Sequence, residues 1–227
     1  PALIWIHGGP GGQSRTGYSP AIQHLVNQGY AVLAVNNRGS SGYGKTFFHL
    51  DDLKHGEDDL QDIVYGKKYL QSLDWVAADR IGVMGGSYGG YLVSWIAGHT
   101  ERYKALINHA GVYNLMGQFA SDVTTHRVHA YGGAPWSGLE VMQQWNPALF
   151  ADKFVTPMLI MHGEQDYRVP VTQGLEIYGV YKGKGLDARL VYFPNENHWI
   201  LKPNNSIFWF NEFTSWLQRY VPAGPTD

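Results

Sequence analysis

Short apolar runs recur along the chain and mark the expected strands. Each run is about as long as a buried strand and is rich in β-branched or aromatic residues, and most of them end at Gly, Asn or Pro. The runs are Leu3–His7, Ala31–Asn36, Ile81–Met84, Ala105–His109, Met158–His162 and Leu190–Phe193. Because their apolarity is continuous rather than alternating, we expect strands that are covered on both faces, as in a parallel sheet.

Segments with helical spacing fall between these runs. They are Pro20–Gln28, Asp58–Leu73, Tyr88–Gly98, Val171–Tyr181 and Ser206–Tyr220. Gly29 follows the first of them and suits the left-handed residue that often ends a helix. The alternation of strand and helix predicts an α/β fold, doubly wound, with a mostly parallel sheet and helices on both of its faces.

The stretch from about residue 111 to residue 157 interrupts this alternation. It is rich in Gly, Trp, His and Tyr and has weak periodicity, so we expect irregular helices and loops that lie like a cap over one end of the sheet. No internal repeat or low-complexity linker is visible, and residues 1–227 are therefore predicted to form one domain. The acidic cluster between Asp51 and Asp59 is expected to be a solvated helix start.

Composition and charge exclude several classes of protein. Hydrophobic residues make up 44% of the chain and charged residues 16%, which excludes general disorder. The formal net charge of -2 gives no electrostatic footprint for nucleic acid. No apolar run reaches the roughly eighteen residues that a membrane span needs. The chain has no cysteine, which excludes disulfides, thiolate nucleophiles and cysteine-based metal sites.

The beginning of the chain carries no targeting signal. It opens at Pro1, without an initiating Met or a signal peptide, and enters an apolar run at once. We therefore expect a fragment of a longer polypeptide. The compartment stays open, with the cytoplasm favoured over the periplasm or secretion.

A candidate nucleophile lies between a predicted strand and a predicted helix. Gly85–Gly90 contains Gly-x-Ser-x-Gly around Ser87, the pattern of a serine held on a sharp strand-to-helix turn where flanking side chains do not fit. The bare pattern is weak because the chain has 28 glycines, and its alternative is a glycine-rich turn that packs on the sheet. The surrounding strand and helix favour the nucleophile. A dinucleotide site would need Gly-x-Gly-x-x-Gly, which this stretch does not supply.

A base and an orienting acid follow later strands, in the chain order that this type of turn predicts. Asp166 comes after the fifth run and His198 after the sixth, so all three side chains are expected at one edge of a parallel sheet. His198 would take the proton of the serine, and Asp166 would fix the histidine tautomer. Glu164 and Glu196 are competing acids. His162 is predicted to be packed and hydrogen-bonded.

No metal or cofactor is required by this chemistry. His126 and His129 could suggest a metal pair, but no nearby carboxylate or third ligand completes a site. We expect a solvated or core role for both.

The loop after the first strand is a candidate oxyanion hole. His7–Gly12 contains four glycines, and glycine lets the backbone approach a tetrahedral oxygen closely. One backbone N–H would come from Gly8 or Gly9, which spacing does not separate, and the other from Tyr88, the residue after the nucleophile. A phosphate-binding loop is disfavoured because Gly-Lys-Ser/Thr is missing.

With these residues in place, the chain resembles the catalytic domain of the prolyl oligopeptidase family of serine peptidases, an α/β-hydrolase fold. The acylaminoacyl-peptidase and dipeptidyl-peptidase branches look most similar. The resemblance runs through nearly the whole chain and is carried by His7–Gly12, Asn37–Gly44, Asp79–Gly82, Gly86–Gly90, His162–Pro170 and Asn197–His198.

The resemblance implies a substrate class and a set of contacts. The expected activity is hydrolysis of short peptides from the N-terminal side, releasing acylated amino acids or dipeptides through an acyl-enzyme. Arg168 would contact a substrate carbonyl, although pairing with a local acid is an equal alternative. Tyr113, Phe119 and Trp136 would line the pocket for the residue before the scissile bond.

The chain departs from the family pattern at its start. Family members carry an N-terminal β-propeller, and neither the propeller nor the first strands of the hydrolase domain are recognisable here. The resemblance therefore implies an N-terminally truncated catalytic domain whose parent chain carries the propeller. The expected partner is a small peptide or ester, and an oligomer is left open. A carboxylesterase and a non-catalytic binding module are the alternative functions.

Overall fold

The computed structural model describes residues 1–224. Six strands form one sheet in the order β2-β1-β3-β4-β5-β6, and every neighbouring pair is parallel. The strands are β1 (Ala2–Ile6), β2 (Ala31–Val35), β3 (Ile81–Gly86), β4 (Leu106–His109), β5 (Met158–Gly163) and β6 (Ala188–Phe193). The predicted parallel sheet is thus confirmed, with each predicted strand in its place.

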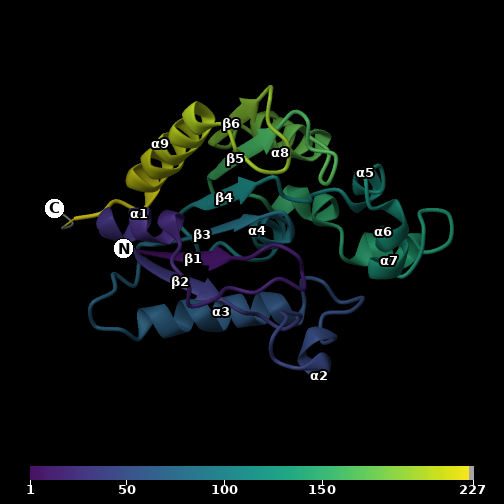
Figure 1. The fold of residues 1–227 in the computed structure, drawn as a ribbon, viewed down its shortest axis with the longest axis horizontal. Coiled ribbons are helices and arrows are strands. Elements are labelled where there is room, and N and C mark those ends of the chain that lie inside the picture. The colour runs from purple at the N-terminus through teal and green to yellow at the C-terminus, as the bar shows by residue number, and fades with distance from the viewer. Residues whose placement is uncertain (225–227) are drawn as a thin grey trace.

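Helices connect the strands and cover the sheet (Figure 1). They are α1 (Pro20–Asn27), α2 (Lys45–Phe48), α3 (Asp58–Gln71), α4 (Tyr88–His99), α5 (Leu115–Gln118), α6 (Thr124–Ala130), α7 (Leu139–Gln144), α8 (Thr172–Gly183) and α9 (Pro203–Tyr220), with a 3₁₀ segment η1 (Pro147–Lys153). The sequence missed only the single turn of α2 among the elements outside the cap-like segment. One turn is too short to show a helical period.

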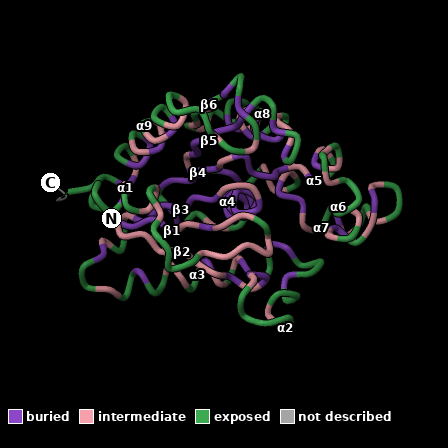
Figure 2. Tube along the Cα trace, in the orientation of Figure 1, coloured by how far each residue is buried: buried purple, intermediate pink, exposed green. Residues whose placement is uncertain are grey.

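Side chains of each strand alternate between two apolar clusters, one on each face of the sheet. On β1, Leu3 packs with Phe213 of α9, whereas Ile4 packs with Ile63 of α3. Figure 1 shows α9 and α3 on opposite sides of the strands, and Figure 2 shows the central strands β1, β3, β4 and β5 mostly buried between them. Burial on both faces explains why the strands are continuously apolar in sequence.

The cap-like segment lies beyond the carboxyl ends of the strands, where α5, α6 and α7 gather at one end of the molecule (Figure 1). These helices are short, so side chains satisfy part of the backbone. The Asn146 Oδ1 atom accepts hydrogen bonds from Leu115 N at 3.1 Å and from Ala148 N at 3.3 Å, which ties α5 to η1. Irregular helices over one end of the sheet were the expectation for this segment. The prediction of one domain for residues 1–227 stays a prediction.

The acidic cluster differs from the solvated helix start that the sequence predicts. Asp59 is fully buried at the start of α3, and Asp51 is only 2% exposed. The Asp51 carboxylate lies against the loop that follows β2, where a Cβ atom on Gly39 would sit 2.3 Å from its carboxyl carbon. The other acids behave as expected: Asp52 and Glu57 are exposed, and Asp58 forms a part-exposed ion pair with Arg38 at 3.0 Å.

Among residues 1–224, no helix combines the length and apolar character that crossing a bilayer requires.

Candidate active site

Ser87 sits on a strained turn between β3 and α4. Its φ is 59° and its ψ is -117°, a combination that a residue with a Cβ rarely adopts. The Ser87 N–H donates to the carbonyl oxygen of His109 at 2.9 Å, which ties the turn to the end of β4. The structure therefore places this serine on the kind of turn that the Gly-x-Ser-x-Gly pattern predicts.

The glycines on both sides of Ser87 are required by close backbone contacts. A Cβ atom on Gly85 would lie 2.2 Å from the carbonyl oxygen of Gly89. A Cβ atom on Gly89 would lie 2.3 Å from the carbonyl oxygen of Ile6, at the end of β1. Backbone atoms cannot move aside as a flexible side chain does, so the turn excludes larger residues at both positions.

Gly89→Ala is expected to lower the free energy of unfolding by about 2 kcal/mol, because the added methyl group overlaps backbone atoms of β1. Urea unfolding followed by tryptophan fluorescence measures this. Gly179→Ala is the matched control: Gly179 also lies in a helix, but its Cβ would meet nothing within 4 Å. The control should be neutral or stabilising by up to about 1 kcal/mol. Equal destabilisation of the two variants would contradict the steric argument.

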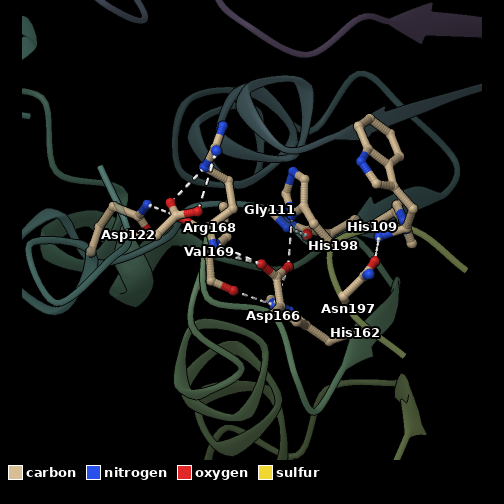
Figure 3. A network of polar contacts seen from close by, with 12 residues as sticks. His109, Gly111, Asp122, His162, Asp166, Arg168, Val169, Asn197 and His198 are labelled. Carbon is tan, nitrogen blue, oxygen red and sulfur yellow. Dashed lines mark hydrogen bonds and ion pairs between the residues drawn. The ribbon is translucent and has the colours of Figure 1, made fainter. Parts of the chain in front are cut away.

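The predicted base and acid are in direct contact. His198 Nδ1 lies 2.7 Å from Asp166 Oδ2, and the other carboxylate oxygen accepts from the backbone N–H of Val169 at 2.8 Å and of Arg168 at 3.0 Å (Figure 3). Burial alone would raise the pKa of Asp166, but hydrogen bonds from His162, His198 and Val169 hold it well below its ordinary value. A charged carboxylate at Nδ1 leaves Nε2 of His198 free to accept a proton.

The competing acids do not reach His198 in this way. Glu164 is exposed to solvent after β5. The Glu196 carboxylate is buried but accepts hydrogen bonds from Leu201 N at 3.1 Å, from Lys202 N at 3.0 Å and from the Asn205 side chain at 2.7 Å. Glu196 therefore shapes the loop that carries His198.

His162 and His109 flank the Asp166–His198 pair. His162 is fully buried, its Nε2 lies 2.8 Å from Val169 O and 3.4 Å from Asp166 Oδ2, and the packed, hydrogen-bonded state predicted for it is confirmed. Burial is the main cause that lowers the pKa of His109 to about 3, and electrostatic coupling to His162 and His198 adds to it. His109 thus stays neutral beside His198 (Figure 3), while its carbonyl oxygen holds the Ser87 N–H.

The glycine loop after β1 packs directly on the serine. A Cβ atom on Gly8 would lie 3.2 Å from Ser87 Cβ and 3.9 Å from Ser87 Oγ. Gly9 has φ of 136°, in the region that favours glycine. The His7 side chain anchors the loop, because its Nε2 lies 2.8 Å from Ser40 Oγ. The loop that is expected to supply an oxyanion donor therefore lies against Ser87 through Gly8, and the choice between Gly8 and Gly9 stays a prediction.

A cavity of about 830 Å³ opens beside Ser87. Gly9, Ser87 and Tyr88 contribute to its wall, as do apolar side chains of the cap-like segment that the sequence did not single out. The apolar lining residues from this segment include Val112, Leu115, Met142 and Trp145. The cavity therefore offers an apolar environment next to the serine.

The predicted pocket residues lie elsewhere. Tyr113 is 3% exposed and packs in the core, where its ring faces Phe154 at a centroid distance of 6.2 Å. Phe119 and Trp136 form an edge-to-face pair at 5.6 Å, and Trp136 is 79% exposed. None of these three side chains lines the cavity. The neighbour Val112 does line the cavity.

Arg168 forms the ion pair that was its alternative role. Its Nε donates to Asp122 Oδ1 at 2.7 Å and its Nη2 to Asp122 Oδ2 at 3.2 Å (Figure 3). Both side chains are close to half exposed, so this ion pair stabilises the folded chain only weakly. Contact between Arg168 and a substrate carbonyl stays a prediction.

His126 and His129 lie on α6 and contribute to the cavity wall. Within residues 1–224, no group of three or more His, Cys, Asp or Glu side chains has the arrangement of a metal site.

The chain is similar over most of its length to a known family and to several known proteins. A family model described as the prolyl oligopeptidase family matches residues 16–223. A dipeptidyl-peptidase 5 of Schizosaccharomyces pombe is 35% identical over 97% of this chain, and one of Porphyromonas endodontalis is 33% identical over 97%. The chain spans about a third of the length of these relatives, 33% in both cases.

Solved structures give the same picture of the fold. An acylaminoacyl peptidase of Pyrococcus horikoshii superposes with a TM-score of 0.93 at 27% identity, over 100% of this chain and 38% of that one. A puromycin-hydrolysing peptidase of Mycobacterium tuberculosis reaches a TM-score of 0.93 at 22% identity, over 100% of this chain and 35% of that one. The predicted α/β-hydrolase fold is confirmed.

Proposed function

Because the chain belongs to the prolyl oligopeptidase family, we propose that it is the catalytic domain of a serine peptidase in which Ser87, His198 and Asp166 form the catalytic triad. The observation that carries the proposal is the 2.7 Å contact between His198 Nδ1 and Asp166 Oδ2, which lies at the same sheet edge as the strained Ser87. A buried carboxylate behind a histidine gives the base its tautomer and stabilises the imidazolium.

The proposed reaction has two halves. The Ser87 hydroxyl attacks the scissile carbonyl while His198 Nε2 takes its proton, and the backbone N–H groups of Tyr88 and of Gly9 or Gly8 stabilise the oxyanion. His198 then gives the proton to the leaving amine, and an acyl-enzyme on Ser87 remains. Water repeats the sequence and releases the acid. Gly9 is the favoured donor of the two glycines because it contributes to the cavity wall.

The proposed substrates are short peptides, from which the enzyme releases acylated amino acids or dipeptides. The names of the relatives support this class, as does a solved acylaminoacyl peptidase, 27% identical, in complex with Z-Gly-Gly-Phe-chloromethyl ketone. Val112, Leu115 and Trp145 give the cavity an apolar wall that suits an apolar side chain before the scissile bond. We also propose that this catalytic domain belongs to a longer parent chain that carries an N-terminal β-propeller.

Gly-Phe-p-nitroanilide and acetyl-Phe-p-nitroanilide form a matched pair of test substrates, because they share the bond to be cleaved and differ at the N-terminal side. We expect hydrolysis of at least one of them, together with labelling by a fluorophosphonate probe. Hydrolysis of p-nitrophenyl acetate alone would instead indicate the alternative, a carboxylesterase. A chain that neither labels nor turns over any of the three would be a binding module, and the proposal would be wrong.

A further inference from the structure

The hydroxyl group of Tyr88 reaches a buried carboxylate on another helix. Tyr88 is the first residue of α4, directly after Ser87, and its hydroxyl donates to Asp59 Oδ2 at 2.5 Å. His55 Nδ1 lies 3.2 Å from the same hydroxyl. The ring of Tyr88 packs against the rings of Tyr91 and His55, each at a centroid distance of 5.4 Å. The side chain of the residue after the serine is therefore fixed at its far end.

Asp59 is itself held rigidly. Its Oδ1 accepts from Gly56 N and from Leu60 N, both at 2.8 Å, which leaves Oδ2 for Tyr88. Burial raises the pKa of Asp59 to about 6, so the group is a carboxylate at neutral pH and above. A charged acceptor with three donors in fixed positions is a strong anchor for a phenol.

This anchor matters because of the position of Tyr88 in the site. The Tyr88 N–H is at the first position of a helix, where no intrahelical acceptor exists, and it is the proposed oxyanion donor. A backbone N–H moves only when its residue moves. Ser87 is tied on one side by its N–H bond to His109 O, and the Tyr88 hydroxyl provides the tie on the other side. Oxyanion donors stabilise a transition state only when they are held in position before it forms.

We propose that Asp59 is a positioning residue of the oxyanion hole, which acts through the hydroxyl of Tyr88 to hold the Tyr88 N–H in place. Asp59 touches no reacting atom in this scheme, and the inference rests on the proposed peptidase function. His55 supports the same hydroxyl and has Asp51 Oδ2 at 3.5 Å from its Nδ1. The buried acids that the sequence assigns to a solvated helix start thus have a role in the site.

The test uses Tyr88→Phe, Asp59→Asn and the double variant, assayed at pH 8 with the anilide that the wild type cleaves. Loss of the tie should lower kcat about tenfold in each single variant, less than the hundredfold or more that follows loss of a donor itself. KM should change less than about twofold, since the ground-state carbonyl gains little from the oxyanion hole. The affinity for a peptidyl trifluoromethyl ketone, which forms a tetrahedral adduct, should fall in proportion to kcat/KM.

The double variant separates positioning from general support of the fold. If Asp59 acts through Tyr88, Asp59→Asn in the Tyr88→Phe background should lower kcat no further. Tyr181→Phe is the matched control: Tyr181 is also buried, its hydroxyl donates to Thr156 O at 2.9 Å, and it does not line the cavity. It should lose stability comparable to Tyr88→Phe but keep its kcat.

Three results would overturn the inference while leaving the peptidase proposal standing. The first is an active wild type in which Tyr88→Phe keeps full kcat. The second is a loss of kcat that is additive in the double variant. The third is unchanged affinity of Tyr88→Phe for the trifluoromethyl ketone. If Asp59→Asn does not fold, Tyr88→Phe against Tyr181→Phe still decides the question. An inactive, unlabelled wild type would instead reject the proposed function.

Discussion

Ser87→Ala is expected to lower kcat for the cleaved anilide roughly a million-fold, which is the scale seen when a triad serine is removed. The alanine removes the attacking oxygen, whereas the strained backbone, the glycine loop and the Asp166–His198 pair stay in place. The remaining rate should come only from substrate binding and the oxyanion hole. Progress curves at high enzyme concentration measure it, and a fluorophosphonate probe should no longer label the chain.

Ser72→Ala is the control for this experiment. Ser72 is exposed at the end of α3, its hydroxyl donates to Tyr69 O at 2.7 Å, and it does not line the cavity. It should keep both labelling and turnover. Persistent labelling of Ser87→Ala would show that another serine reacts, and the assignment of the nucleophile would then be wrong.

The large loss of kcat expected for Ser87→Ala depends on an arrangement of the site that the sequence already predicts. Continuous apolar runs predict buried parallel strands, and parallel strands bring their carboxyl ends to one edge. Ser87, Asp166 and His198 each follow such a run, so their common location needs only the strand order. The glycines around Ser87 carry a local signal as well, because backbone contacts at 2.2 and 2.3 Å permit no Cβ at Gly85 or Gly89.

The residues that line the cavity could not be predicted from the sequence pattern in the same way. Tyr113 and Val112 are adjacent in sequence, yet the first packs on Phe154 and the second lines the cavity. Which of two neighbours faces inward in an irregular segment depends on distant contacts, such as the Gln173 side chain that accepts from Tyr113 N at 2.9 Å. No period along residues 111–157 encodes such contacts.

The buried acids escaped prediction for a related reason. A run of Asp and Glu before a helix is usually solvated, and Asp58 follows that rule. Asp59 departs from it because Gly56 N, Leu60 N and the Tyr88 hydroxyl all donate to its carboxylate. The hydroxyl comes from a residue on another helix, so only the assembled fold reveals that this acid is satisfied when buried.

Asp166→Asn is expected to lower kcat about ten-thousand-fold, although the new side chain has nearly the same shape. The Asn amide N–H₂ would donate to Nδ1 of His198, where the carboxylate accepts at 2.7 Å. The histidine proton would then sit on Nε2, the atom that must take the proton of Ser87. Steady-state kinetics with the cleaved anilide measures the loss, and KM should change much less than kcat.

Glu164→Gln is the matched control, since Glu164 is an acid of the same loop that is exposed to solvent. It should keep kcat within about twofold, as surface changes away from such contacts have small effects. If Glu164→Gln lost as much activity as Asp166→Asn, the orienting acid would have to be reassigned.

Asp166→Asn is also expected to change how the stability of the fold depends on pH. Hydrogen bonds from His162, His198 and Val169 hold the pKa of Asp166 below its ordinary value of about 3.9, so the folded chain binds fewer protons there than the unfolded chain. The stability that this carboxylate contributes is therefore fully present above about pH 4 and is lost as the pH falls further. Urea unfolding at pH 7 and pH 3 should show a difference between the wild type and Asp166→Asn that shrinks at the lower pH. A difference that grew on acidification would mean that the carboxylate is not stabilised by its partners, and the account of His198 held by a charged Asp166 would fail with it.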